Sequence, residues 1–273
     1  MSNVCILTDS TVQFTRPDFS GHERVFVIPF EFQTRTQQGD GPRLRSGLSK
    51  RLIPPSTQEF IRFYTQLSRA YDTIFVLTLS SLLNPATRFA LSASLQYSNH
   101  ATINVVDSLT TGIGLGLLVQ SAAAAMSAGA LPVEIERRIR ASIPRIYMLF
   151  CIPELMYLVQ SGYMAYSQAL VGEMMGMLPI FAIEEGRLTP MEKVRTQRHL
   201  FESLQEFMNE FDAPAHIALL HGASQNATRT RLVRQYVQET FPDTLFSEHT
   251  IGPHLAALFG PQSTGLVIME KLD

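Results

Sequence analysis

Acidic and hydroxyl side chains cluster in the segment Thr8–Phe14, which reads TDSTVQF. The segment directly follows the apolar run Val4–Thr8, which is typical of a buried strand. Because open α/β sheets bind ligands beyond the carboxyl ends of their strands, the segment is a candidate ligand site. A turn in which Asp9 or Ser10 caps backbone amides is the alternative. A further alternative is a small-molecule enzyme that uses Asp9, Asp107 and the nearby hydroxyl groups at the strand ends.

Two further segments carry partial catalytic or binding signatures. The run TTGIGLG, Thr110–Gly116, follows another strand-like stretch and begins a helical pattern. Its three glycines form GxGxG, which lacks the last glycine of a dinucleotide-binding loop, so close packing of a helix on a sheet is the favoured interpretation. The pair Ser80-Ser81 has no G-x-S-x-G sequence around it. The local signature of a triad hydrolase is therefore missing.

Metal and thiol chemistry are not indicated by the spacing of their usual residues. The seven histidines are scattered, and His216 and His221 flank a strand-like run instead of occupying i, i+4 positions on a helix. Cys5 and Cys151 lie within apolar runs and have no basic or histidine neighbours in the sequence. We expect buried, inert thiols, no metal site and no catalytic residue.

The composition is that of a globular protein with a substantial core. Of 273 residues, 45% are hydrophobic and 17% are charged, which is too little charge for a disordered chain. A net charge of -2 gives no electrostatic reason to expect a nucleic-acid partner. The first residues lack the pattern of a signal peptide, and no apolar stretch reaches the ~18 residues of a transmembrane segment. With two cysteines in apolar runs, which fit a reducing compartment, these features favour a cytoplasmic location.

Short apolar runs alternate with helical patterns along the first half of the chain. The expected strands are Val4–Thr8, Val25–Phe30, Ile74–Leu79 and Ile103–Val106, and the expected helices are Gln58–Ser68, Pro85–Tyr97, Gly114–Ala128 and Pro132–Ser142. This alternation predicts a mainly parallel sheet covered by helices on both faces. The glycine- and proline-rich segment Gly39–Pro55 is expected to be an exposed loop.

A second series of elements begins near residue 150. The expected strands are Arg145–Ile152, Leu178–Glu184, His216–His221, Thr244–Glu248 and Leu266–Glu270, and the expected helices are Glu154–Ser161, Tyr166–Met175, Arg198–Phe211 and Arg229–Thr240. Because compact domains typically hold about 100–150 residues, we predict two α/β domains, covering residues 1–150 and 151–273.

The segment GEMMGML gathers flexible, polarizable side chains. Met174, Met175 and Met177 are separated by at most one glycine from one another. Methionine adapts to a long apolar ligand as readily as it fills gaps in a core. The sequence leaves both interpretations open.

In order and spacing, the chain resembles the DegV family of fatty-acid-binding proteins over nearly its whole length. The resemblance is carried by the blocks ILTDST, VLTLSSLLNPATRFALSAS, VVDSLTTGIGLGLLV, PELMYLVQSGYMAYSQALVGEMMGMLPIFAIEEGRLTPMEKVRT and IGPHLAALFGPQSTGLVIM. It implies two α/β domains and a fatty acid whose chain is buried in a tunnel, largely in the C-terminal domain. Its carboxylate would lie at the domain interface.

The same resemblance implies a role and a set of site residues. Similar proteins are not enzymes; they present the bound fatty acid to a separate fatty acid kinase and need no other cofactor. The residues implied for the head group are Ser10, Ser81, Asn84, Ala86, Thr87 and Tyr163. Those implied for the acyl-chain pocket are Phe30, Met174, Met175, Met177, Leu258 and Phe259.

The sequence departs from the family at the polar positions of that site. Asn84-Pro85-Ala86 replaces the family's S-G-T, Tyr163 replaces the arginine of G-G-R-I, Leu258 and Phe259 replace the histidine and threonine of G-A-H-T-G-P-G, and Leu52 aligns loosely with a threonine. A buried carboxylate without donors is costly. Either neutral donors such as Asn84 and Tyr163 bind an altered head group, or the site takes a neutral or different apolar ligand.

Overall fold

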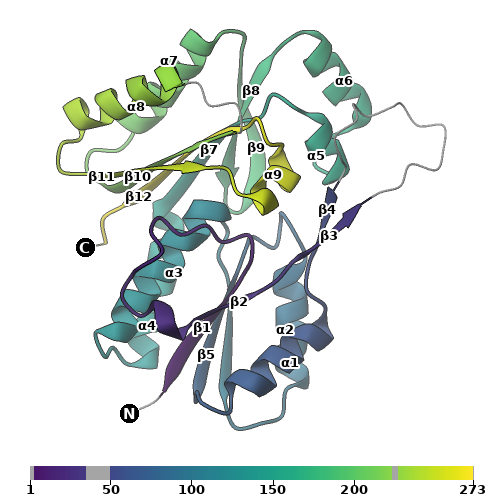
Figure 1. Cartoon of the computed structure of the whole chain (residues 1–273), viewed down its shortest axis with the longest axis vertical. Coiled ribbons are helices and arrows are strands. Elements are labelled where there is room, and N and C mark those ends of the chain that lie inside the picture. The colour runs from purple at the N-terminus through teal and green to yellow at the C-terminus, as the bar shows by residue number, and fades with distance from the viewer. Residues whose placement is uncertain (1–2, 35–49, 223–226, 273) are drawn as a thin grey trace.

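The computed structural model describes residues 3–34, 50–222 and 227–272, which form two α/β units, one above the other in Figure 1. The first unit is built on a four-stranded sheet in the order β2-β1-β5-β6. All its neighbouring strands are parallel, which confirms the predicted mainly parallel sheet. The strands are β1 (Val4–Asp9), β2 (Val25–Ile28), β5 (Thr73–Thr78) and β6 (Thr102–Asp107).

Helices cover both faces of this sheet, as predicted. They are α1 (Thr57–Leu67), α2 (Ala86–Gln96), α3 (Gly112–Ser127) and α4 (Pro132–Ser142), with short 3-10 turns at His22–Arg24 and Ile143–Arg145. Ser56 and Glu59 form a capping box that fixes the start of α1. Phe60 and Tyr64 of α1 pack with Cys5 and Ile74 against one face of the sheet. The other face packs against α3.

The second unit is built on a six-stranded mixed sheet in the order β11-β10-β12-β7-β8-β9. Only β10 and β11 run parallel. The strands are β7 (Ile146–Cys151), β8 (Leu178–Glu184), β9 (Arg187–Val194), β10 (Pro214–His221), β11 (Leu245–Thr250) and β12 (Thr264–Glu270). The chain passes to this sheet between α4 and β7.

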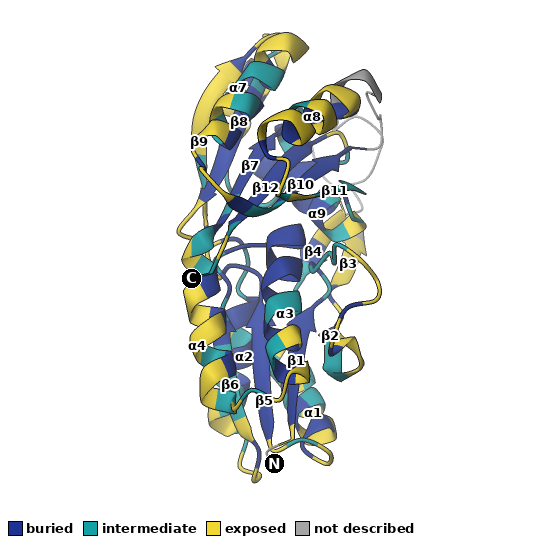
Figure 2. Ribbon diagram, turned by 90° about the vertical axis from the view of Figure 1, so that its left-hand side faces the viewer, coloured by how far each residue is buried: buried dark blue, intermediate teal, exposed yellow. Residues whose placement is uncertain are grey.

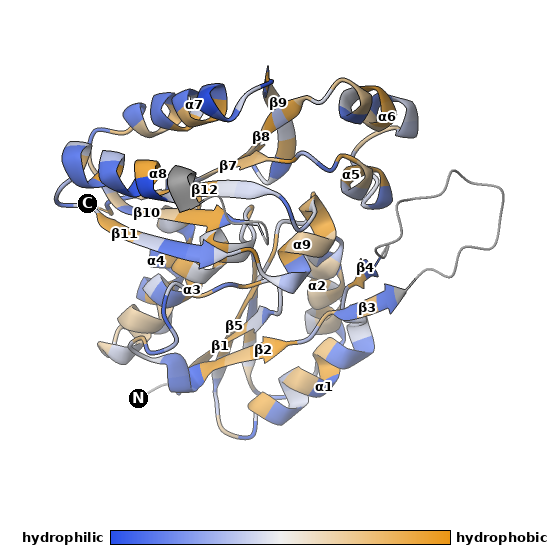
Figure 3. Ribbon diagram, turned by 45° about the horizontal axis from the view of Figure 1, so that its top comes forward, coloured by the Kyte–Doolittle hydropathy of each residue, from blue (hydrophilic) through white to orange (hydrophobic). Residues whose placement is uncertain are grey.

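In the described part of the chain, five helices accompany the second sheet. They are α5 (Met156–Gln160), α6 (Tyr166–Met174), α7 (Gln197–Asn209), α8 (Ala227–Thr240) and α9 (Pro253–Phe259). Helices α7 and α8 cover the face turned away from the first unit, where Leu204 and Val237 pack with Ile217 and Ile268. Helix α9 lies at the junction of the two units, where it contacts β4 and α5 and shows mainly hydrophobic colours in Figure 3.

Strand β9 is not among the expected strands. Its sequence, RLTPMEKV, is mostly polar, and Pro190 interrupts any strand pattern. The structure tolerates this proline because β9 is an edge strand, where a missing N–H disturbs only one side. Within the expected loop Gly39–Pro55, positions 39–49 lie outside the described residues. Part of the remainder forms β4 (Lys50–Ile53), which pairs with β3 (Glu31–Thr34).

One apolar cluster joins the two units. It contains Leu77 and Leu118 from the first unit and Phe150, Phe181 and Leu220 from the second. Figure 2 shows buried residues continuing from one unit into the other. We call this the interdomain cluster; the two sheets therefore share a desolvated interior.

The glycines of α3 allow its N-terminal half to pack closely between the units. An ideal Cβ on Gly116 would lie 2.1 Å from the carbonyl oxygen of Gln13. One on Gly114 would lie 2.1 Å from Thr110 Oγ1, and Gly112, at φ 53°, lies against Leu255 of α9. The GxGxG segment thus packs the helix against its neighbours, in agreement with the favoured interpretation.

Replacing Gly116 by alanine tests this packing role. Its new methyl group would clash with backbone, which cannot move aside as a side chain can, so we expect a loss of about 1–3 kcal/mol in the free energy of unfolding. Urea titration of the purified protein measures this loss. The control is Ser127→Ala on the exposed end of the same helix, with an expected change within about 0.5 kcal/mol. Equal stabilities of the two variants would contradict the account.

Candidate functional site

The carboxyl ends of the first sheet's strands face the second unit. Thr110, beyond β6, donates its hydroxyl hydrogen to Met148 Sδ of β7, and Gln13, beyond β1, donates to the carbonyl of Thr250. Gly252 in turn donates its N–H to Gln13 Oε1 over 3.2 Å. The edge at which an open α/β sheet places its ligand is therefore the domain interface.

Asp9, the acid of the TDST segment, is completely buried at this edge. Its carboxylate accepts hydrogen bonds from Thr11 N, Thr11 Oγ1 and Leu79 N, at 2.9, 2.5 and 2.7 Å. Burial raises the pKa of Asp9 to about 6, against the lowering effect of these hydrogen bonds. Asp9 thus joins the ends of β1 and β5, and its oxygens are taken up by the protein's own donors.

The loop that follows β5, residues 79–85, carries two of the predicted head-group residues, Ser81 and Asn84, and two more, Ala86 and Thr87, begin the helix after it. Ser81 is exposed, and its N–H donates to Asp107, so that this second strand-end acid also holds a loop. Thr87 is buried at the start of α2, with its hydroxyl 2.8 Å from that of Thr78. The neighbouring Ser80 donates to the carbonyl of Gly186 across the interface over 2.6 Å.

Tyr163 and Asn84 meet at this loop. The Tyr163 hydroxyl donates to the carbonyl of Leu83, linking the segment after α5 to the first unit. Burial raises the pKa of Tyr163, so this hydroxyl stays protonated. Asn84 Oδ1 accepts the N–H of Ala86, two residues later, in an Asx-turn just before α2, and Ala86 itself is buried. Tyr163 thus contacts Leu83, the residue that precedes Asn84.

Ser10 lies at the other end of α9. Its hydroxyl accepts the N–H of Phe30 over 2.8 Å and lies 3.0 Å from His254 Nε2. The His254 ring stacks on Phe32 with 4.9 Å between centroids, and burial lowers the pKa of His254. Nothing in the sequence pattern pairs Ser10 with a residue 244 positions later, so His254 was not foreseen.

Three of the residues expected in the acyl-chain pocket belong to the interdomain cluster. Phe30, Leu258 and Phe259 are at most 5% exposed. The Phe259 ring lies 5.0 Å from that of Phe150 and 6.5 Å from that of Tyr163, between centroids. Aromatic rings therefore stand between the sheet and the polar loop.

The three methionines lie at the end of α6 and in the segment that follows it. Met174 is 79% exposed and Met175 51% exposed, while Met177 is half-buried. Helix α6 ends at Met174, and Gly176, at φ 60°, turns the chain away before β8. Only Ala169 and Gly172 of α6 are buried. The two exposed methionines thus take no part in the interdomain cluster that Phe30, Leu258 and Phe259 join.

The turn at residues 258–263, here called the Gly260 turn, closes the far side of the cluster. Gly260 has φ 92°, and an ideal Cβ there would lie 2.9 Å from Tyr157 Cδ2 and 3.1 Å from Glu154 Oε2. The N–H of Gln262 donates to the Glu154 carboxylate over 3.3 Å. Sequence reasoning did not single out Glu154, which brings a negative charge to the site.

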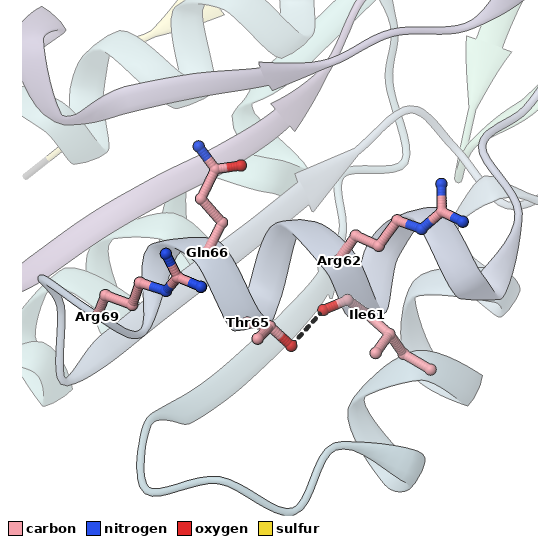
Figure 4. Close-up of a pocket in the computed structure, with 5 residues that line it drawn as sticks. All are labelled: Ile61, Arg62, Thr65, Gln66 and Arg69. Carbon is pink, nitrogen blue, oxygen red and sulfur yellow. Dashed lines mark hydrogen bonds between the residues drawn. The ribbon is translucent and has the colours of Figure 1, made fainter.

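Two hollows on the first unit differ in their relation to this site. One, of about 550 Å³, is lined by Ile53, Pro54, Ser56, Thr57, Gln58, Pro85 and Phe89 and so adjoins Asn84. The other, of about 390 Å³, lies on the outer face of α1. Figure 4 shows its side chains, Arg62 and Arg69 among them, spread along the helix without converging on a common point.

The described residues do not form a reactive thiol site or a metal site. Burial raises the pKa of Cys5 to about 12, and Cys151 is buried as well. Within the described ranges no group of three or more histidine, cysteine, aspartate or glutamate residues is placed to hold a metal ion. No helix in that part of the chain is long and apolar enough to cross a membrane.

Comparisons with known proteins agree on one family. A family model described as "Uncharacterised protein, DegV family" matches residues 3–271. A DegV domain-containing protein of Caldanaerobacter subterraneus is 24% identical, over 99% of this chain and all of that protein. A fatty acid binding DegV family protein of Streptococcus agalactiae has a similar structure, with a TM-score of 0.84 and 20% identity over the whole of both chains.

A third relative is known with its ligand. The Fatty Acid Kinase (Fak) B3 protein of Streptococcus pneumoniae, loaded with linoleic acid, superposes with a TM-score of 0.79. The two chains are 15% identical, and the match covers 98% of this chain and 100% of the relative.

The raised pKa of Asp9 predicts a pH dependence of stability. The folded pKa, about 6, lies above the ordinary value of 3.8, so the folded protein binds this proton more tightly than the unfolded chain. The stability gained from the protonated form is therefore lost as pH rises from about 4 to about 6. We therefore compare the free energies of unfolding of the native protein and of the Asp9→Asn variant. The native value minus the variant value should fall by up to about 3 kcal/mol between these pH values.

Urea titrations at several pH values measure this difference, with the exposed Asp18→Asn as control. A difference that stays flat or rises with pH would show that Asp9 is not a buried, destabilised carboxylate.

Proposed function

Because the chain belongs to the DegV family, we propose that it is a non-enzymatic lipid-binding protein. Its ligand is a single-chain lipid, with a long-chain fatty acid as the first to test. The alkyl chain lies in the interdomain cluster, and the head group lies at the loop of residues 79–85. A neutral or different apolar ligand at the same site is the alternative, because aromatic and aliphatic side chains surround that end.

The observation that carries this proposal is the continuity of the interdomain cluster. Leu83 of the first unit and Leu158, Leu258 and Phe259 of the second are all buried in one apolar interior. Each methylene group moved out of water contributes about 0.8 kcal/mol. A long alkyl chain therefore gains far more from this interior than a small polar substrate does.

We propose roles for the residues around this interior. Tyr163 and Asn84 stand closest to the head group, with Ser10, Ser81, Ala86 and Thr87 shaping the surrounding loops. Phe30, Leu258 and Phe259 form the wall of the chain pocket. Met177, Met174 and Met175 belong to its outer end, where the exposed side chains of Met174 and Met175 meet a lipid on its way in.

The strand-end acids argue against the enzyme interpretation. Asp9 is buried and bonded to Thr11 and Leu79, and Asp107 accepts the N–H groups of Ser81 and Leu109. A catalytic carboxylate needs an oxygen within reach of its substrate. Both acids are instead used to shape the loops of the site.

A fatty acid kinase is the partner that we propose for the loaded protein. Support comes from the kinase-associated relative of Streptococcus pneumoniae, which is loaded with linoleic acid. A cytoplasmic location agrees with the two buried cysteines, which form no disulfide with each other. The protein would then carry the bound lipid to the kinase, which would use it as a substrate.

Analysis of the lipid that co-purifies with the protein tests the proposed function. We expect organic extraction and mass spectrometry to recover about one single-chain lipid per protein molecule. An unrelated protein of similar size, purified from the same host in the same way, is the control. A protein that carries no lipid, and takes up neither fatty acids nor other single-chain lipids when these are offered, would refute the proposal.

A second prediction concerns the apolar residues at the head-group end. Leu258→His combined with Tyr163→Arg places two donors beside the proposed head group. We expect this variant to bind hexadecanoate at least about tenfold more tightly at neutral pH, because charged hydrogen bonds contribute about 1.5–3 kcal/mol. Isothermal titration calorimetry measures the affinity, and circular dichroism verifies the fold.

The matched control introduces the same residues elsewhere. Leu131→His with Leu95→Arg changes side chains that are 62% and 88% exposed. An unchanged affinity in the first variant, or an equal gain in both, would count against the placement of the head group.

A further inference from the structure

The Gly260 turn has few free hydrogen-bond donors. The Ser161 hydroxyl donates to the carbonyl of Leu258 over 3.3 Å, and the Ser263 hydroxyl donates to that of Phe259 over 2.6 Å. Nearby, Tyr163 donates to Leu83. These three hydroxyl groups are thus committed to main-chain carbonyls.

The backbone N–H groups of the turn are also engaged. Gly260 donates to Ala256 over 2.8 Å, Ser263 donates to Gly260 over 3.3 Å, and Gln262 donates to Glu154. Pro261 has no N–H to offer. The donors that remain beside the cluster are neutral. Asn84 keeps its amide hydrogens, since only its Oδ1 is bonded, to Ala86, and the Ser81 and Tyr157 hydroxyls donate to no acceptor among the described contacts. Neutral donors stabilise a desolvated carboxylate less than a cation does.

The charges around the turn are mainly negative. Glu154 lies against Gly260, and Glu173 of α6 accepts the N–H of Met156 at the start of α5. Neither carboxylate forms an ion pair with the rest of the described chain. The charge of Glu154 also contributes to the raised pKa of Tyr157, after burial. An anionic head group would meet repulsion at this turn.

Other elements packed around α9 do not reverse this balance. His254, at the opposite end of α9, is bonded to Ser10, and burial favours its neutral form. Lys50 of β4 lies over the Phe32 ring, on which His254 stacks. Across the interface, Asp107 adds a further acid. None of these three groups supplies a positive charge to the turn among the described contacts.

Acceptors, in contrast, are available. The second lone pair of the Leu83 carbonyl and the Oε1 atom of Glu154 have no donor among the described contacts. An uncharged hydroxyl can donate to one of these acceptors and accept from the Asn84 amide. Such a group matches the site in both charge and hydrogen-bonding capacity.

We propose that this site selects an uncharged head group that donates a hydrogen bond. The inference rests on the proposed lipid-binding function and narrows its ligand class. A long-chain alcohol or a monoacylglycerol carries such a group at every pH, and a fatty acid carries it only when its carboxyl group is protonated. Glu154 is the specificity-determining residue, because it repels the ionised form.

Lipid loading at several pH values tests this selectivity. The delipidated full-length protein is mixed with equimolar hexadecan-1-ol and hexadecanoic acid delivered from cyclodextrin at pH 6, 7 and 8. After repurification, the bound lipids are extracted and quantified. We expect alcohol loading to be independent of pH. Acid loading should fall about tenfold per pH unit once the free acid is mostly ionised, since only the protonated form binds.

The alcohol carries its hydroxyl group at every pH, whereas the fatty acid carries one only when it is protonated. Alcohol loading therefore serves as the control for effects of pH on the protein itself. Hexadecanoate loading that does not change with pH and exceeds that of the alcohol would overturn the inference and leave lipid binding intact. Loading of neither lipid would refute the proposed function itself.

Two variants, each of which replaces a glutamate by glutamine, test whether Glu154 causes the selectivity. Glu154→Gln keeps an oxygen that can accept the Gln262 N–H, and it should raise acid loading at pH 8 by about tenfold with the alcohol unchanged. The control, Glu206→Gln, makes the same change at an exposed position of α7 and should leave both unchanged. Equal behaviour of the two variants would overturn the role of Glu154.

Discussion

The architecture depends on one constraint: the apolar interior between the two sheets must be kept from water by elements of both units. Leu77 and Leu118 bury their side chains against residues of the second sheet such as Phe150. Neither unit closes this interior alone, so α9 and the loop of residues 79–85 cover its sides. A ligand that resembles the side chains already there can enter this interior at the lowest cost in desolvated polar groups.

Polar groups at the border of this interior act mostly on the protein's own backbone. Asp9 and Asp107 fix the loops after β1, β5 and β6, while Ser80 and Tyr163 connect those loops to the second unit. A site whose donors are already satisfied is preorganised but not electrostatically suited to an anion. The hydrogen bonds that hold the units together therefore also limit which head group they can accept.

Local sequence patterns predicted much of the fold, because buried strands such as β1 and amphipathic helices such as α1 carry strong periodicity. The polar edge strand β9, with Pro190, carries none. Site residues that act through long-range contacts were harder to foresee. Phe30 and Phe259 were expected beside a ligand and do join one cluster, but the exposure of Met174 depends on where α6 ends relative to the core.

The central claim is that a lipid chain occupies the interdomain cluster. Hydrogen–deuterium exchange of the delipidated protein, with and without a saturating single-chain lipid, tests it most directly. Slower exchange in α5, α9 and the loop of residues 79–85, with α7 and α8 unchanged, is the predicted result. Protection confined to α7 and α8, or absent from the junction while lipid is bound, would contradict it.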